Sequence, residues 1–128
     1  MENTSYLYDT LVRVLSQHAN GLDLRHLKTL AWMMVGLINS YSMSLGAWTP
    51  FVISRAQESQ RTVRRFRRWL DNDKSEVQTL YGPLIQQALG GWVGKRLFVA
   101  LETSMLWDTD CILRLSVVSR GRAVPVVW

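Results

Sequence analysis

Cysteine is nearly absent from this chain of 128 residues. Its one cysteine, Cys111, has no partner for an intramolecular disulfide, which excludes the disulfide-stapled secreted domains and fits a reducing cytoplasm. We therefore expect a cytoplasmic protein. Cys111 opens the apolar run 111–113, so we expect a buried structural thiol rather than a nucleophile.

Long apolar runs and export signals are also missing. The N-terminus is polar, unlike the apolar core of a secretory signal. Residues 29–54 contain no charged side chain, but their unbroken apolar core, residues 31–38, is too short to span a bilayer. We expect a buried central helix here and no membrane partner. A small membrane protein is the alternative interpretation.

Several catalytic signatures are absent as well. The chain has no Gly-rich phosphate loop, no nucleophile elbow and no zinc-ligand spacing. His18 and His26 fall on different expected helices, and their spacing matches neither a metal site nor a catalytic pair. We therefore expect both histidines to be ordinary side chains.

Acidic residues are scarce in one segment, and the net positive charge of the chain resides in that segment. The net charge is +5, and residues 55–68 contain six arginines against one acid, Glu58, while the rest of the chain balances. The planar guanidinium group matches phosphate oxygens bidentately, so a local cationic segment favours a polyanionic partner. A solvated helix face is the alternative. The candidate DNA-binding residues are Arg55, Arg61, Arg64, Arg65, Arg67 and Arg68.

The same segment has the pattern of an amphipathic helix over residues 58–70. Val63, Phe66 and Leu70 fall on one stripe, with Trp69 beside it. One face is therefore expected to pack and the other to present guanidinium groups, an arrangement suited to docking against DNA. The arginines expected on the far side are Arg61, Arg64, Arg65 and Arg68.

Periodicity predicts further helices over residues 4–19, 23–40, 44–53 and 75–89. Asn20 and Gly21 should end the first of these helices, and Asp23 should cap the second. Gly82–Pro83 is expected to kink or divide the last helix, because proline removes a backbone donor.

After Gly90–Gly91 the hydrophobic period changes to that of strands. Strands are predicted over residues 96–103, 111–118 and 123–128, with Arg120–Gly121 in a tight turn. The expected fold class is α+β, with a helical, DNA-binding domain over residues 1–90 and a strand domain over residues 91–128.

Glu102 is a candidate metal ligand. It follows the apolar residues 98–101, which predicts a carboxylate at the end of a buried strand. Strand-end carboxylates hold Mg²⁺, which prefers oxygen ligands. The alternative is a solvent-facing glutamate. Asp108 and Asp110 are expected to form a turn.

The C-terminal motifs resemble a known family. They read LFVALETSMLW over residues 97–107, RLSVV over 114–118 and GRAVPVVW over 121–128, with looser matches upstream in LRHLK at 24–28 and LYGPL at 80–84. Together they resemble bacterial insertion-sequence transposases of the DDE type, over nearly the whole chain. In that family a strand reading aliphatic-A-L-D-T-S-M-L-W opens the ribonuclease-H-like catalytic domain, and GRAVPVVW closes the third strand.

The resemblance implies a helical, helix-turn-helix-like DNA-binding region followed by the first three antiparallel strands of an incomplete ribonuclease-H-like domain. Family members hold two Mg²⁺ on three carboxylates and carry out DNA transposition. The first carboxylate aligns with Glu102, where the family has Asp. The other two would lie beyond Trp128, so we expect a truncated transposase of an insertion element that keeps DNA binding and has lost cleavage and strand transfer. Its other partner would be a second copy or a full-length transposase. A non-enzymatic DNA-binding regulator made from the same helices is the alternative.

Overall fold

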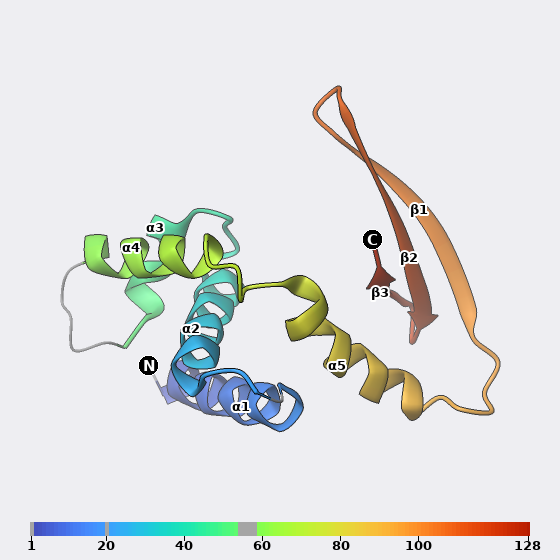
Figure 1. The fold of residues 1–128 in the computed structure, drawn as a ribbon, viewed down its shortest axis with the longest axis horizontal. Coiled ribbons are helices and arrows are strands. Elements are labelled where there is room, and N and C mark those ends of the chain that lie inside the picture. The colour runs from blue at the N-terminus through green and yellow to red at the C-terminus, as the bar shows by residue number, and fades with distance from the viewer. Residues whose placement is uncertain (1, 20, 54–58) are drawn as a thin grey trace. The chain divides into compact units, whose positions relative to one another are not determined.

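The computed structural model describes residues 2–19, 21–53 and 59–128, with the side chain of Glu2 left out. The described residues form an α+β chain in which helices come first and strands second (Figure 1). The chain divides into two compact units, Met1–Leu84 and Ile85–Trp128. The elements are α1 (Glu2–His18), α2 (Leu24–Ser40), α3 (Leu45–Trp48), the 3-10 turn η1 (Thr49–Phe51), α4 (Ser59–Leu70), α5 (Val77–Gly90), β1 (Phe98–Leu106), β2 (Asp110–Ser119) and β3 (Arg122–Val127).

The signals between α1 and α2 act as predicted. Gly21 has a φ of 85°, the left-handed conformation that ends a helix at little steric cost. Asp23 caps α2, because its side chain accepts a hydrogen bond of 2.9 Å from the backbone N–H of Arg25. Asn20, the other predicted stop residue, lies outside the described residues. α2 contacts α1, α3, η1 and α4, so the prediction of a central helix is confirmed (Figure 1).

Two apolar clusters hold the helical unit together, one on each side of α2. Leu15 of α1 packs with Leu27 and Ala31 of α2. The other cluster brings together residues far apart in the sequence, namely Met33, Trp48, Phe66 and Trp69. Phe66 is fully buried, so α4 is fixed to the unit by its own core residue.

Gly36 allows α2 and α3 to approach closely. A Cβ atom at this position would lie 2.8 Å from Cγ of Trp48 and closer still to its Cβ, so the two helices would have to move apart. Gly36→Ala is therefore expected to lower the free energy of unfolding by about 1–3 kcal/mol through overpacking. Urea unfolding checks this, with Gly46→Ala as the control, because a Cβ at Gly46 meets only Ser44 Oγ at 3.8 Å. Equal stability of the two variants would contradict the prediction.

α5 differs from the sequence-based expectation. Pro83 stands inside one continuous helix, so of the two expected outcomes, a kink or a division at Gly82–Pro83, the division does not occur. A proline removes one intrahelical hydrogen bond but leaves those of the neighbouring turns, so a helix can run through it. Leu80 and Leu84 pack against the core cluster around Leu15, which stabilises the first half of α5. The two units part between Leu84 and Ile85, within this helix.

The strands form a three-stranded antiparallel sheet in the order β1-β2-β3. Arg120 and Gly121 join β2 to β3 with φ angles of 50° and 73°, which confirms the predicted tight turn. All three strands exist near their predicted positions, although β1 runs on to Leu106. The coarse prediction of an α+β fold with three antiparallel strands is therefore confirmed.

The sheet is far more exposed than the sequence predicts. Phe98 and Leu101 of β1 are 68% and 67% exposed, so the expectation of a buried first strand is wrong. Cys111 is also exposed, because it pairs with Met105 near the tip of the β1–β2 hairpin. Among the described strand residues only Ser116 and Val117 are buried. Apolar sequence predicted the strands, but burial also needs a covering layer.

A membrane span within residues 29–54 is the alternative that the sequence leaves open. Within the described parts of the chain, none of the helices combines the length and the apolar character that a bilayer span needs. One face of α2 is buried in the helical unit, where Ala31 and Val35 have no exposed surface.

Candidate nucleic-acid interface

α4 is built on a narrow buried stripe. Thr62, Phe66 and Trp69 are its buried residues, at spacings of four and three, which places them on one face. The predicted stripe was rotated from this one, because Leu70 is 53% exposed and Val63 is only partly buried. Three apolar residues in a sequence do not determine which side of a helix becomes buried. In the structure, the packing of α4 against α2 and α3 determines it.

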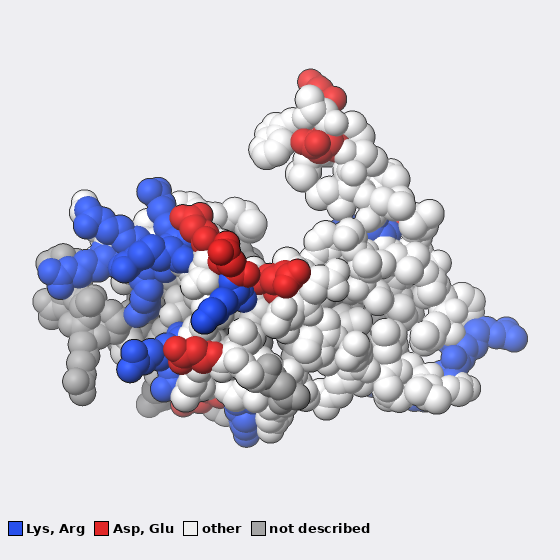
Figure 2. All heavy atoms as spheres, viewed as in Figure 1, with Lys and Arg blue, Asp and Glu red and all other residues white. Residues whose placement is uncertain are grey.

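The opposite side of α4 presents its arginines to solvent. Arg67 and Arg68 stand in the last turn, where a cation also interacts favourably with the helix dipole. Figure 2 shows basic side chains gathered over this part of the helical unit, with acidic side chains beside them. Arg55, the remaining candidate, lies outside the described residues. Four of the candidate DNA-binding arginines are exposed on α4, and they are called the arginine face below. They are Arg61, Arg64, Arg67 and Arg68.

Arg65 is an exception to the predicted face. It is only partly exposed, and its Cζ lies 5.6 Å from the centre of the Phe66 ring. Its Nε and Nη2 atoms are out of reach of solvent and have no hydrogen-bond partner in the described part of the chain. Arg65 flanks the buried stripe, so its predicted place on the far side with Arg61, Arg64 and Arg68 is wrong.

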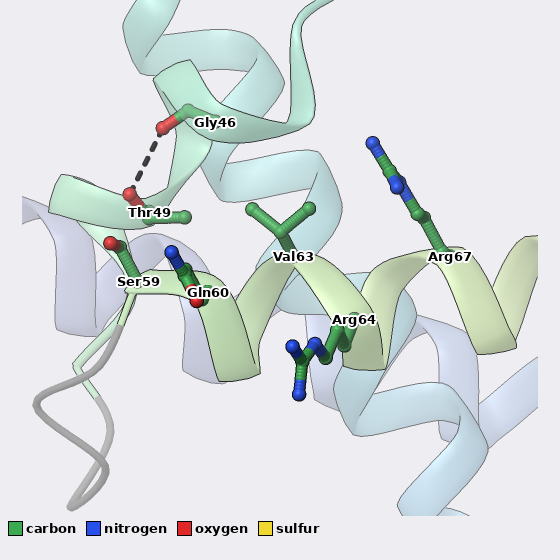
Figure 3. A pocket seen from close by; sticks show the side chains of 7 residues that line it. All are labelled: Gly46, Thr49, Ser59, Gln60, Val63, Arg64 and Arg67. Carbon is green, nitrogen blue, oxygen red and sulfur yellow. Dashed lines mark hydrogen bonds between the residues drawn. The ribbon is translucent and has the colours of Figure 1, made fainter.

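A hollow lies beside the arginine face (Figure 3). It has a volume of about 290 Å³, and Val63 points from α4 toward the segment that carries Gly46 and Thr49. Thr49 of η1 donates a hydrogen bond of 2.9 Å to the carbonyl oxygen of Gly46 at its rim. Sequence reasoning missed these rim residues. Their only signal in the sequence is that small and hydroxyl-bearing side chains occur close to a run of arginines. The polar lining from outside the arginine face is Thr49, Ser59 and Gln60.

A shallow depression that is largely open to solvent, called the cavity below, lies on the other flank of α4, against the first turns of α2. Its basic residues come from both helices, Arg25 from α2 and Arg65 and Arg68 from α4. His26 and Trp69 form one side of it, with their rings stacked at 4.7 Å between centres. The indole Nε1 of Trp69 donates a hydrogen bond of 2.9 Å to the carbonyl oxygen of His26. Sequence reasoning did not find this cavity, because two segments far apart in the sequence, residues 23–29 and 65–72, form it together.

His26 is therefore more than an ordinary surface side chain. Its Nε2 lies 3.2 Å from the hydroxyl of Ser75, which also donates to the carbonyl oxygen of Trp69. Burial lowers the pKa of His26 below its ordinary value of 6.5; Asp23 opposes this shift and Lys74 adds to it. Compared with the unfolded chain, the folded protein therefore favours the neutral ring of His26.

This shift sets a pH dependence of stability. The unfolded chain takes up a proton near pH 6.5, above the pKa of the folded state, so stability is full above pH 6.5 and is lost as the pH falls toward the folded-state pKa. Urea unfolding above and below pH 6.5 is expected to show this loss, and His26→Gln to abolish it. An undiminished loss in His26→Gln would assign the effect to another group.

Glu102 does not stand at a strand end. It lies in the middle of β1 opposite Arg114 of β2, and Arg114 Nε donates to its Oε2 at 3.1 Å. The predicted strand-end position is wrong because β1 continues past residue 103. Asp108 lies in the turn before β2, as predicted, whereas Asp110 opens the strand itself.

Glu102 is engaged by Arg114 in an ion pair, and both side chains are partly exposed. No group of three or more His, Cys, Asp or Glu side chains that could hold a metal ion occurs in the described part of the chain. The chemistry that these residues present is thus that of a cross-strand ion pair.

Comparisons with family models, with curated proteins and with solved structures find no match to this chain.

Proposed function

We propose that the helical unit binds DNA through the arginine face of α4. The observation that carries the proposal is the division of this helix into a buried stripe of Thr62, Phe66 and Trp69 and an exposed side with four arginines. A helix anchored by its own core residues holds its charges in a fixed array, which suits the regular phosphates of a duplex. Phosphate contacts of this kind position a protein on DNA without reading its sequence.

We propose that the chain derives from a DDE-type transposase. The motifs over residues 97–107 and 121–128 support it, as does the order of the chain, helices followed by a three-stranded antiparallel sheet in which GRAVPVVW forms the third strand. In such a protein the helical unit would hold the element's DNA, and the sheet would be the opening part of a ribonuclease-H-like domain.

The second candidate function is DNA binding without chemistry, as in a regulator. The Glu102–Arg114 ion pair favours it, because a carboxylate that accepts from a guanidinium is less available to a cation. An assay of Mg²⁺-dependent cleavage of duplex DNA tests the expected loss of chemistry. Unchanged DNA fits both a transposase that has lost cleavage and a regulator, whereas cleavage that Glu102→Ala removes would overturn the expected loss and exclude the regulator.

A salt series on the full chain tests DNA binding itself. If the four exposed arginines each neutralise one phosphate, the plot of log K against log salt concentration between about 50 and 200 mM should have a slope of about −3 to −4. Fluorescence anisotropy with a labelled duplex measures it. A slope near zero, or no binding at the lowest salt, would overturn the proposal.

A further inference from the structure

We propose that the cavity between α2 and α4, lined by Arg25, Arg65 and Arg68, holds a phosphate of the bound DNA. This inference rests on the proposed function and adds to it a contact from a second helix. Sequence reasoning confined DNA binding to the segment around α4, whereas the fold brings Arg25 of α2 to the same cavity as two of its arginines.

The charges of the cavity favour an anion. Three guanidinium groups line it against one carboxylate, that of Asp23, which already accepts the N–H of Arg25 at the start of α2. Arg68 belongs both to this cavity and to the arginine face. A phosphate here would therefore continue the row of phosphates on the arginine face.

Arg65 supplies the strongest local attraction. A guanidinium group stays charged at all ordinary pH values, and its buried Nε and Nη2 have no acceptor in the described residues. Because water is kept from much of this cation, its attraction for an anion is screened less than that of an exposed arginine. A phosphate in the cavity would supply a nearby countercharge, which the described residues do not supply to these two atoms.

The walls of the cavity suit a fixed site. Trp69 is held by its hydrogen bond to the His26 carbonyl and by the stacked His26 ring, so this side is rigid. The volume of about 440 Å³ leaves room for a phosphate group with several waters, each of which occupies about 30 Å³. Thr29 and Asn72 offer further polar groups at the lining.

Arg25→Gln tests the inference, with Lys28→Gln as its matched control. Both residues are exposed on the first turns of α2, but Lys28 does not line the cavity. We expect Arg25→Gln to weaken binding to a duplex about tenfold near 0.1 M salt and to reduce the salt slope by about one. Lys28→Gln should change the affinity less than about twofold, because a charge at a distance is screened.

The outcomes separate this inference from the proposed function. A steep salt slope in the parent chain with equal, small effects of both variants overturns the cavity site and leaves DNA binding in place. A flat parent slope overturns both. Unfolding curves of the two variants that match the parent curve show that an affinity loss in Arg25→Gln comes from binding.

The source of the phosphate is tested with two duplexes, one with and one without 5′-terminal phosphates. An equal effect of Arg25→Gln on both supports a backbone phosphate. An effect confined to the phosphorylated duplex overturns that assignment. Inorganic phosphate, followed by the NMR signals of the Trp69 indole N–H, provides a probe without DNA, and a shift that Arg25→Gln suppresses supports the site.

Discussion

Replacing the four residues of the arginine face by glutamine lowers the affinity for duplex DNA by about 10²- to 10³-fold near 0.1 M salt. Each phosphate contact changes log K by roughly 0.9 for every tenfold change in salt, so losing four contacts removes most of the electrostatic attraction. Arginine and glutamine have similar helix propensities, so α4 itself should persist. The variant carries Arg61→Gln, Arg64→Gln, Arg67→Gln and Arg68→Gln, and anisotropy against the parent chain measures the loss.

Lysine at the same four positions is the control. It keeps the positive charge but not the planar fork, so the salt slope should stay near that of the parent while the affinity falls only modestly. Circular dichroism of both variants monitors α4. If the glutamine and lysine variants lose affinity equally with intact helices, charge on this face is not what holds the DNA.

Phe66→Ala is expected to have the largest effect on stability, a loss of about 3–5 kcal/mol in the free energy of unfolding. Phe66 has no exposed surface, and its ring packs 6.0 Å from that of Trp48, centre to centre. Truncation leaves a cavity among Met33, Trp48 and Trp69, where three segments of the unit meet. Urea unfolding, followed by tryptophan fluorescence, measures the loss.

Two further variants serve as controls for this prediction. Phe66→Leu keeps most of the buried volume and should cost markedly less than the alanine variant. Val63→Ala removes a partly buried side chain from the same helix, so it controls for a change on α4 outside the core. A Phe66→Ala variant as stable as Val63→Ala would mean that α4 is not anchored by its aromatic residue.

Local signals in the sequence were sufficient for the caps and turns of the chain, although the helix expected over residues 44–53 is a short α3 followed by the 3-10 turn η1. The cap at Asp23, the left-handed Gly21 and the Arg120–Gly121 turn depend on one or two residues each, and the structure has all three. These features are decided by short-range sterics and hydrogen bonds, so a single sequence contains them. Pro83 is the exception, because tertiary packing of α5 offset a local penalty.

Burial could not be predicted in the same way. Leu70, Phe98 and Cys111 are apolar or small, yet each is exposed. Whether an apolar side chain is covered depends on neighbouring elements that a linear pattern does not specify. Arg65 shows the reverse, a charged residue drawn partly under cover beside Phe66.

The candidate site was found in part. The run of arginines is visible in the sequence, and four of the six candidates lie on the exposed side of α4. The contribution of Arg25 and His26 could not be seen, because it depends on how α2 packs across α4. The Glu102–Arg114 ion pair was also missed. It depends on the register between β1 and β2, which the spacing of residues along either strand does not specify.

α4 both packs into the core and presents a row of arginines, and this combination has a thermodynamic consequence. In the free protein, like charges three and four residues apart on one helix repel each other and oppose the packing of Phe66 and Trp69. Neutralisation by phosphates removes that repulsion, so a polyanion that binds the folded state raises its melting temperature by mass action. Under the proposed function, occupancy by nucleic acid and integrity of the helical core would be coupled through α4.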